Sequence, residues 1–263
     1  MQLKLLDQLR QQNPVVLNIS NFVTVQDVAN GLNAIGASPI MSQEIAEAEP
    51  MVKMAGAVQL NLGTLTKVQI AQTLKAGELA NQFHKPIVLD PVAVGAVNYR
   101  LEVAQKCLTA FHADIIRGNA GEVAALGGFT WNAKGIDAGE GSGNIDEIAK
   151  ATAQKYHCVV ISSGATDTIT DGKKVVHVNN GTPLFQVHVG SGDMLSSITA
   201  AFAAISPDNL FEAAQTATLV FGAVGELVAQ EHPEAGPGTF AVYLMDYLAK
   251  AQVADLEKIV SYD

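Results

Sequence analysis

The sequence predicts a three-layer α/β fold in which a mostly parallel central sheet is flanked by helices, with antiparallel strands at one side. Short β-rich segments alternate with helix-forming segments along much of the chain. Hydrophobic residues make up 48% of the sequence and charged residues only 16%, so apolar segments must cover one another on several faces. The 263 residues fit within one α/β domain, and we assign residues 1–263 to a single domain.

The chain begins with a predicted amphipathic helix. In MQLKLLDQLRQQNP the leucines recur at helical spacing with charges between them, unlike the uninterrupted apolar core of a signal peptide. Strands are predicted at residues 15–18, 57–61, 86–90, 114–116 and 158–162. Crossover helices are predicted at residues 23–35, 67–83, 101–111 and 121–126. Strands joined by helical crossovers form a parallel, right-handed sheet.

The pattern changes after residue 162. Segments 168–170, 174–178 and 184–189 are predicted antiparallel strands, because Asp171-Gly172 and Asn180-Gly181 are hairpin turn signals. From residue 193 to about residue 250 the chain is predicted to be helical, with breaks near residues 206–207 and 233–238, and to cover one sheet face. The glycine-rich segment 135–143 is predicted to be a mobile loop. A phosphate-binding loop is disfavoured there, since its acidic residues would repel phosphate.

Charge and cysteine content narrow the class of partner. The formal net charge of -10 argues against nucleic acid or an anionic membrane as a bulk partner, because both require a basic field. The apolar stretches are shorter than the ~20 residues that a bilayer span requires. Cys107 and Cys158 match no zinc or redox spacing and are interpreted as reduced core thiols of a cytoplasmic protein.

The segment from Val189 to Met194, VGSGDM, carries the strongest chemical signal. It is predicted to run from a strand into an Ala-rich helix, and Gly190 and Gly192 let backbone amides approach a ligand closely. The helix N-terminus adds unpaired N–H groups and partial positive charge, which together form an anion site. Asp193 has two interpretations: an ordinary N-cap, or a base that accepts a hydroxyl proton during phosphoryl transfer.

Further charged residues are predicted at the same edge of the sheet. Arg117 leaves one strand and Glu122 enters the following helix, where ligands bind in open α/β folds. The guanidinium could hold a polyphosphate bidentately or form a surface ion pair. Asp90, at the end of another strand, supplies with Glu122 the hard oxygen ligands that Mg²⁺ uses. The alternatives are a turn aspartate for Asp90 and a first-turn helix carboxylate for Glu122.

Polar amides and a thioether occur early in the chain, in VLNISN at residues 16–21 and GASPIM at residues 36–41. Asn21 and Met41 suit a small aromatic heterocycle with one polar edge, although Met41 is also a candidate core residue. The sequence contains no Walker lysine, no Gly-x-Ser-x-Gly elbow and no complete Gly-x-Gly-x-x-Gly motif. P-loop ATPases, α/β hydrolases and nicotinamide enzymes are therefore disfavoured.

Taken together, these motifs make the chain resemble the hydroxyethylthiazole kinases of thiamin salvage, within the ribokinase-like fold. The resemblance covers nearly the whole length. It rests on motifs that occur in the same order: NISN at 18–21, GLNAIGASPIM at 31–41, NLGT at 61–64, DPV at 90–92, RGN at 117–119 with Glu122, and GSGD at 190–193.

The resemblance implies ATP- and Mg²⁺-dependent phosphorylation of 4-methyl-5-(2-hydroxyethyl)thiazole in a homotrimer with active sites at subunit boundaries. It implies nucleotide binding at Arg117, Ser163, Gly190 and Gly192, metal binding at Asp90 and Glu122, a thiazole pocket at Asn21, Met41 and Gly190, and Asp193 as the base. Many relatives carry Cys in place of Asp193. The alternative is a sister activity of the same fold: a hydroxymethylpyrimidine or sugar kinase, or an ATP-dependent dehydratase of hydrated nicotinamide cofactor.

Overall fold

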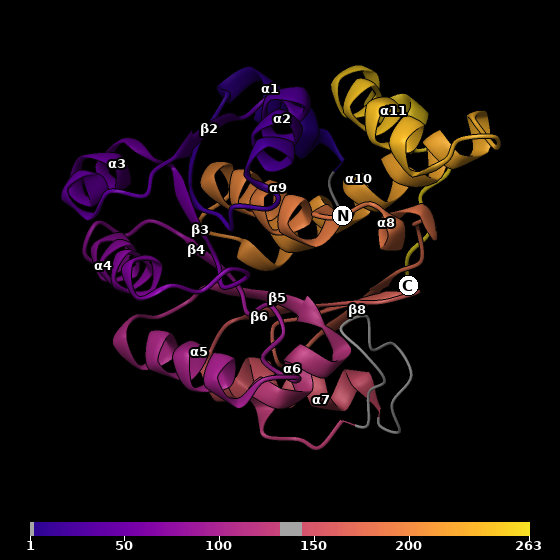
Figure 1. The fold of residues 1–263 in the computed structure, drawn as a ribbon. Helices are drawn as coiled ribbons and strands as arrows, with labels where there is room; N and C mark the ends of the chain where they lie inside the picture. Colours follow the sequence, from indigo (N-terminus) through magenta and orange to yellow (C-terminus); the bar gives the residue numbers. More distant parts are fainter. Residues whose placement is uncertain (1–2, 132–143) are drawn as a thin grey trace.

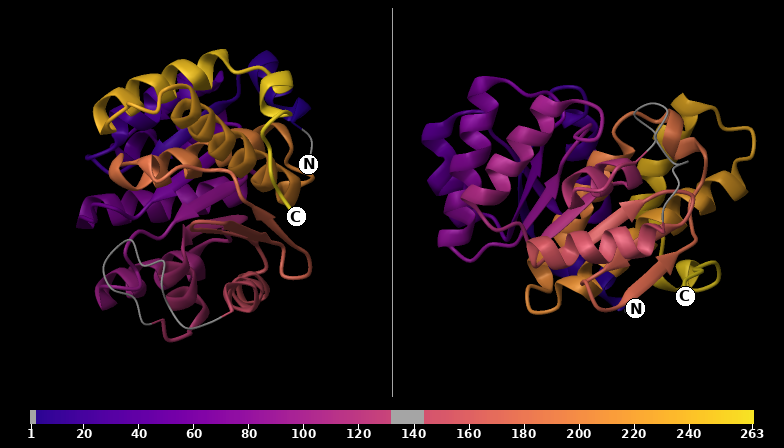
Figure 2. Two further views of the ribbon diagram at one scale, coloured as in Figure 1. Left: turned by 90° about the vertical axis from the view of Figure 1, so that its right-hand side faces the viewer. Right: turned by 90° about the horizontal axis from the view of Figure 1, so that it is seen from below.

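The computed structural model describes residues 3–131 and 144–263, which build an eight-stranded sheet between two layers of helices (Figures 1 and 2). The strand order is β2-β1-β3-β4-β5-β6-β7-β8. Pairing is parallel from β2 to β6 and antiparallel between β6, β7 and β8. The predicted three-layer arrangement with antiparallel strands at one side is confirmed. The predicted loop at 135–143 lies outside the described residues.

The central strands are short and apolar because helices cover both of their faces. Every residue of β3 and β4 is buried. The strands are β1 (Val15–Ile19), β2 (Ser38–Met41), β3 (Ala57–Asn61), β4 (Ile87–Asp90), β5 (Ile115–Asn119), β6 (Val159–Ser163), β7 (Asp167–Thr170) and β8 (Val175–Val178).

One face of the sheet is covered by the first helices and by the C-terminal helices, as predicted for the late helices (Figure 1). Phe202 and Phe240 are fully buried in this layer. Its helices are α1 (Lys4–Gln12), α2 (Val25–Ile35), α8 (Leu184–Val187), α9 (Ser191–Ile205), α10 (Leu210–Glu231), α11 (Pro237–Lys250) and α12 (Val253–Leu256).

The other face packs a separate apolar cluster against helices from the middle of the chain. Cys107 and Cys158 are free and buried in this cluster, and burial raises the thiol pKa values to about 11 and about 12. The elements of this layer are the 3-10 turn η1 (Ile45–Glu47), α3 (Ala48–Met54), α4 (Lys67–Gln82), α5 (Asn98–Ala110), α6 (Ala120–Gly127) and α7 (Ile145–Tyr156).

The prediction of a third antiparallel strand at 184–189 was wrong, because residues Leu184–Val187 form the short helix α8. Phe185 explains the difference: its ring stacks on Phe221 at 4.7 Å and meets Phe240 edge-on at 5.5 Å. Asn180 is not a hairpin residue either, since its side-chain amide donates to Glu226 and to the backbone of Ile259. Packing against α10 and α11 thus overrides the local turn signal.

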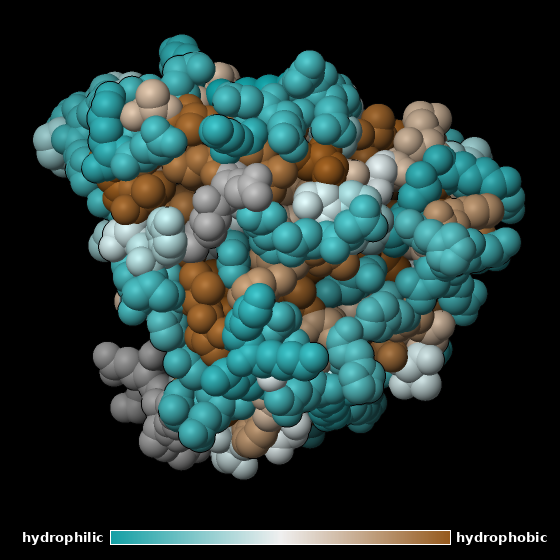
Figure 3. Space-filling view, turned by 180° about the vertical axis from the view of Figure 1, so that it is seen from behind, coloured by the Kyte–Doolittle hydropathy of each residue, from teal (hydrophilic) through white to brown (hydrophobic). Residues whose placement is uncertain are grey.

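Part of the surface is apolar. Seen from behind, areas of hydrophobic residues are visible among the polar residues (Figure 3). Several large apolar side chains are exposed, among them Phe22 and Val189, at 71% and 68%. Within residues 3–131 and 144–263, no helix combines the length and apolar character needed to cross a bilayer.

Candidate active site

The site forms where the strand order reverses. β1 pairs with β2 on one side and with β3 on the other, so the connections leave β1 and β3 toward opposite faces of the sheet. Open α/β sheets bind ligands at such a switch point, beyond the carboxyl ends of the strands. Asn61 lies beside Asp90 in register there, and Asn18 lies between Met41 and Gln59. The pattern of polar residues ending buried strands therefore gathers side chains at one edge.

Asp193 points from the first turn of α9 into this edge. It is buried, with 5% exposure, and its Oδ1 accepts from Gln59 Nε2 at 2.9 Å. Its Oδ2 accepts from Thr24 Oγ1 at 2.6 Å and from Asn21 Nδ2 at 3.2 Å. The N-cap position belongs to Gly190, which has φ +99°, so the interpretation of Asp193 as a helix cap was wrong. Instead, the carboxylate accepts hydrogen bonds from side chains of other segments at the sheet edge.

Burial changes the acidity of this carboxylate. Removal from water, together with the nearby negative charge of Asp90, raises the pKa of Asp193 to about 7, although the side chains of Thr24, Asn61 and Gln59 act in the lowering direction. A carboxyl group with a pKa near neutrality can both accept and release a proton under ordinary conditions. This is the property expected of a general base.

Arg117 brings the positive charge of the site. Its guanidinium donates from Nε to Ser163 Oγ at 3.1 Å, and its Nη1 lies 3.8 Å from Asp90 Oδ2. Only 14% of the side chain is exposed, so Arg117 is not a surface ion pair. A Cβ at Gly192 would collide with the guanidinium, which places Arg117 directly against the first turn of α9. Arginine and helix N-terminus thus meet at one point, as an anion site requires.

Asp90 and Glu122 are two further buried carboxyl groups near Arg117. Asp90 is buried and accepts from Ser196 Oγ at 2.8 Å, and burial raises its pKa against the lowering effect of Arg117. Glu122 accepts from the backbone amide of Ala93 at 2.6 Å. It also accepts from the amide of Asn119 at 2.8 Å, within a capping box at the start of α6. Burial and the charge of Asp90 raise the Glu122 pKa to about 7.

The donor set of Asp90 and Glu122 fits Mg²⁺. Asp90, Glu122 and Asp193 are all less than 9% exposed, and Arg117 is the cation that the structure places among them. A divalent cation would balance this excess of buried negative charge. The described residues contain no cluster of three or more His, Cys, Asp or Glu side chains able to hold a metal. Mg²⁺ does not require one, because it keeps waters and phosphate oxygens in its shell.

The residues predicted for the heterocycle lie at the neighbouring strands. Asn21 contacts Asp193 directly and also donates to Asn61 Oδ1 at 3.2 Å. A Cβ at Gly190 would lie 2.8 Å from Thr24 Cγ2, so Gly190 approaches the same group of residues. Met41 ends β2 in register with Asn18 and packs partly buried against the hydrophobic core. Met41 therefore packs against the core and also lies at the sheet edge where the site forms.

Sequence reasoning missed Thr24, Gln59 and Ser196, each of which donates to an active-site carboxylate. A signal existed for Gln59, because it is a polar residue inside the otherwise apolar strand AVQLN. Ser196 lies one helical turn after Asp193, on the same side of α9. Thr24 precedes α2 and looks like an ordinary cap.

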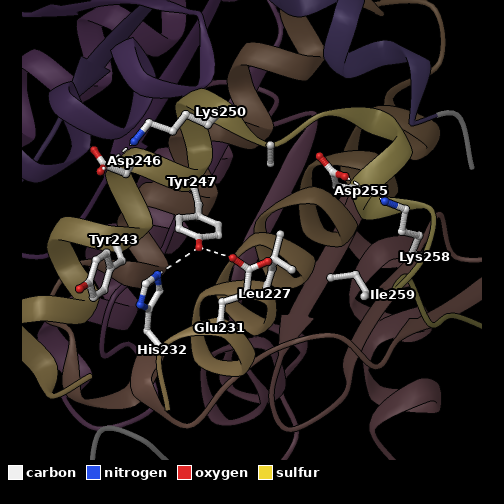
Figure 4. A pocket seen from close by; sticks show the side chains of 11 residues that line it. Leu227, Glu231, His232, Tyr243, Asp246, Tyr247, Lys250, Asp255, Lys258 and Ile259 are labelled. Atoms are coloured by element: carbon white, nitrogen blue, oxygen red, sulfur yellow. Dashed lines mark hydrogen bonds and ion pairs between the residues drawn. The ribbon is translucent and has the colours of Figure 1, made fainter. Parts of the chain in front are cut away.

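A separate pocket of about 590 Å³ opens between α10, α11 and the segment that contains α12 (Figure 4). His232 stacks on Tyr243 at 3.7 Å, and its Nε2 lies 3.1 Å from the Tyr247 hydroxyl. Tyr247 in turn donates to Glu231. The residues that line this pocket include none of the residues predicted for the active site, so the pocket is distinct from the sheet edge.

Comparison with known proteins identifies the family of the chain. A model described as the hydroxyethylthiazole kinase family matches residues 6–254. The chain is 64% identical over 263 residues to hydroxyethylthiazole kinase from Levilactobacillus brevis, covering 100% of both chains. It is 62% identical to the enzyme of that name from Lactiplantibacillus plantarum, with the same coverage.

Solved structures extend the comparison to the fold. The hydroxyethylthiazole kinase protein of Pyrococcus horikoshii OT3 matches with a TM-score of 0.90 at 33% identity, covering 99% of this chain and 97% of that chain. A ribokinase-like superfamily protein from Enterococcus faecalis V583 matches with a TM-score of 0.65 at 13% identity, covering 95% of each. The predicted ribokinase-like fold is confirmed.

Proposed function

The chain belongs to the hydroxyethylthiazole kinase family, and from this premise we propose that residues 1–263 form one kinase domain that phosphorylates 4-methyl-5-(2-hydroxyethyl)thiazole with ATP and Mg²⁺. The observation that carries the proposal is the convergence at one sheet edge of a buried carboxylate, an arginine and a helix N-terminus. These groups are the parts that phosphoryl transfer to an alcohol requires.

Asp193 is the proposed base. As the substrate oxygen attacks the γ-phosphorus of ATP, the carboxylate takes the hydroxyl proton, the new O–P bond forms, and the bond to the β–γ bridging oxygen breaks to release ADP. Because phosphoryl transition states are loose, positioning and electrostatic stabilisation contribute more than the proton transfer itself. With a pKa of about 7, Asp193 is about half ionised near neutral pH, so the base form is present and the proton that it accepts is held and released readily.

Arg117 and the start of α9 are the proposed polyphosphate site. The guanidinium packs against Gly192, so it and the first-turn amides of α9 face the same anion and stabilise charge on the transferred group. Ser163 orients Arg117 through the 3.1 Å hydrogen bond to Nε, and Gly190 lets the backbone turn with φ +99°. Arg117, Ser163, Gly190 and Gly192 are therefore assigned to ATP.

Asp90 and Glu122 are the proposed Mg²⁺ ligands. Bound Mg²⁺ would neutralise charge on the β- and γ-phosphates. Ser196 holds the Asp90 carboxylate at 2.8 Å, and the Ala93 amide holds Glu122 at 2.6 Å, so both oxygens are fixed before a ligand arrives. This preorganisation lowers the cost of ordering the site on binding.

Asn21, Met41 and Gly190 are the proposed thiazole pocket. The Asn21 amide offers the polar contact, and the thioether of Met41 offers a polarisable apolar surface for a sulfur-containing aromatic ring. The hydroxyethyl arm would then extend toward Asp193, which lies 3.2 Å from Asn21 Nδ2.

The assembly proposed from the family resemblance is a homotrimer with sites at subunit boundaries. Phe22 and Val23 are 71% and 57% exposed and immediately follow Asn21, while Val189, at 68%, immediately precedes Gly190. Large apolar side chains exposed beside a site suit burial by a neighbouring subunit. The free buried cysteines and the acidic net charge fit the cytoplasm as the proposed location.

A substrate panel tests the function. The protein is incubated with ATP, Mg²⁺ and, separately, hydroxyethylthiazole, hydroxymethylpyrimidine, ribose and hydrated nicotinamide cofactor, and products are identified by mass spectrometry. We expect ADP formation and a phosphorylated thiazole. Phosphate on the pyrimidine or the sugar alone, or dehydration of the nicotinamide substrate alone, would refute the thiazole assignment. Light scattering with and without substrate tests the trimer.

A further inference from the structure

The hydrogen bonds to Asp193 distinguish its two oxygens. A carboxylate offers about four acceptor positions, two on each oxygen. Oδ2 fills both of its positions, with Thr24 Oγ1 at 2.6 Å and Asn21 Nδ2 at 3.2 Å. Oδ1 accepts from Gln59 Nε2 at 2.9 Å, which leaves one acceptor position. Among the hydrogen bonds of the described residues, therefore, only those of Oδ1 leave room for a further proton.

We propose that Gln59 and Thr24 are positioning residues that lock the Asp193 carboxylate, so that Oδ1 alone accepts the proton of the substrate hydroxyl. This inference rests on the proposed function and deepens it, because it names the accepting atom and the groups that orient it. In the step itself, the oxygen–hydrogen bond of the alcohol breaks and an oxygen–hydrogen bond forms at Oδ1, while the alcohol oxygen bonds to phosphorus.

Gln59 occupies a position where a hydrophobic residue would serve the fold better. It is fully buried in β3, between Asn18 of β1 and Val88 of β4 in register. Its Oε1 has no hydrogen-bond partner among the described residues, and a buried acceptor without a partner is destabilising. Within residues 3–131 and 144–263, the one side-chain hydrogen bond of Gln59 goes to Asp193. The buried Gln59 amide thus lowers the stability of the fold, and its hydrogen bond holds the Asp193 carboxylate.

Thr24 shows the same departure from local structural needs. It is the N-cap residue of α2, yet its side chain makes no capping hydrogen bond to that helix. Threonine at this position ordinarily accepts from the first-turn amides. Here the Thr24 hydroxyl donates to Asp193 Oδ2 instead, across 169 residues of sequence. Two residues from different elements therefore give up a local role or a hydrophobic contact to hold the same side chain.

Charged groups from the neighbouring elements set the background for this arrangement. Asp90 of β4 raises the Asp193 pKa by its negative charge. Arg117 of β5 packs against Gly192, next to Asp193 in α9, and Glu122 of α6 lies near Asp90 and Arg117. None of these charged groups donates a hydrogen bond to Asp193 among the described residues, so orientation of the carboxylate falls to neutral side chains: Gln59, Thr24 and Asn21 donate to it, and the Asn61 amide also lowers its pKa.

The test compares Gln59→Leu and Thr24→Val with the matched controls Gln215→Leu and Thr216→Val, which replace buried residues of α10. We expect kcat to fall about 10- to 100-fold in Gln59→Leu and Thr24→Val, with the KM for ATP changing less than about twofold. Thr24→Ser, which keeps the hydroxyl, should restore most of the activity. Gln59→Leu should melt at the same temperature as the wild type or higher, and the controls should keep wild-type kcat.

Two further measurements separate positioning from a general effect on the fold. In an Asp193→Asn background, Gln59→Leu should cause no additional loss of kcat, because the group that it orients is already changed. In the otherwise unaltered chain, the titration of Asp193, followed by the ¹³C shift of its carboxyl carbon, should move upward by about one pH unit in Gln59→Leu. That titration needs no substrate and therefore remains informative if the proposed activity fails.

Different results would overturn the positioning role of Gln59 and Thr24 and the proposed function. Wild-type kcat in both Gln59→Leu and Thr24→Val, a further loss of kcat in the Asp193→Asn background, or an unchanged Asp193 titration would overturn the inference. A wild-type protein that phosphorylates none of the panel alcohols would overturn the proposed function instead. If Gln59→Leu does not fold, the pair Thr24→Val and Thr24→Ser decides the question alone.

Discussion

Two clusters of titratable residues in this molecule show the same kind of pKa shift from different causes. At the sheet edge, burial and the charge of Asp90 raise the pKa of Asp193 to about 7. In the pocket between α10 and α11, the hydrogen bond to Glu231 raises the pKa of Tyr247 to about 12 (Figure 4). The first side chain is 5% exposed, whereas the second is only partly buried and its contact with Glu231 is exposed.

The comparison of the two regions shows which raised pKa lowers the stability of the folded protein. Inside the sheet edge, the protein holds a carboxylate where water cannot stabilise its charge, and stability is lost whenever that group ionises. At the surface, solvent screens the interaction between Tyr247 and Glu231, so the contact contributes little. A raised pKa indicates a functional site only when desolvation and a specific charge partner act together in an enclosed site. Asp193 meets this condition, and Tyr247 does not.

The largest effect is expected for Asp193→Ala. Removing the base should lower kcat by roughly 10²- to 10⁴-fold, the range that general base catalysis contributes. ATP should still bind, because Arg117 and the α9 amides are not altered. Steady-state kinetics with the thiazole, together with calorimetric titration of ATP, measures both quantities. Undiminished turnover would contradict the role given to Asp193.

A second prediction concerns Gly192→Ala, which forces a methyl group into the space of the Arg117 guanidinium. Displacement of Arg117 should raise the KM for ATP by about tenfold or more, the value of one lost charge-assisted hydrogen bond. Gly181→Ala is the matched control, because a methyl group there meets no described atom within 4 Å. A KM that rises equally in both variants would show that Arg117 is not the nucleotide contact.

The third prediction is the pH dependence of stability. The folded pKa of Asp193, about 7, exceeds its ordinary value of 3.8, so the folded state binds more protons between these values and stability falls as pH rises through this range. Asp193→Asn, which stays neutral, should therefore be more stable than the wild type at pH 8, by up to roughly 4 kcal/mol. Urea unfolding at pH 5 and pH 8 measures this, and the advantage should be smaller at pH 5.

The pH dependence of turnover follows from the same group. Only the ionised carboxylate accepts a proton, so kcat should rise with pH and level off above about 7. If the kcat of the wild type did not change between pH 5 and pH 8, ionisation of Asp193 would not control turnover.

The smallest effect is expected for Tyr247→Phe, which removes the hydroxyl that donates to Glu231. Because the group is exposed, the free energy of unfolding should change by less than about 1 kcal/mol. Turnover should equal that of the wild type, since the pocket shares no residue with the sheet edge. A large loss of activity would mean that the two regions are coupled, and the contrast between them would fail.

Much of the fold could be predicted because its signals are local. Alternating β-rich and helical segments located β1, β3 to β8, and the motif around Gly190 located the start of α9. The failure at residues 184–189 came from the same kind of signal, since a β-rich run after Asn180-Gly181 reads as a strand. Only the packing of Phe185 on Phe221 shows that this run is helical.

The candidate site divides in the same way. The sequence by itself determined which residues could carry charge or turn tightly: Asp90 ends β4, Arg117 lies in β5, and Glu122, Gly190 and Asp193 lie where helices begin. Parallel strands bring such residues to one edge. Only the tertiary structure decided that Thr24 donates to Asp193 rather than capping α2, and that Gln59 points to the same carboxylate. Local periodicity predicts the helix or strand that carries a side chain. The residue that this side chain contacts depends on strand order and on how α9 packs across the sheet.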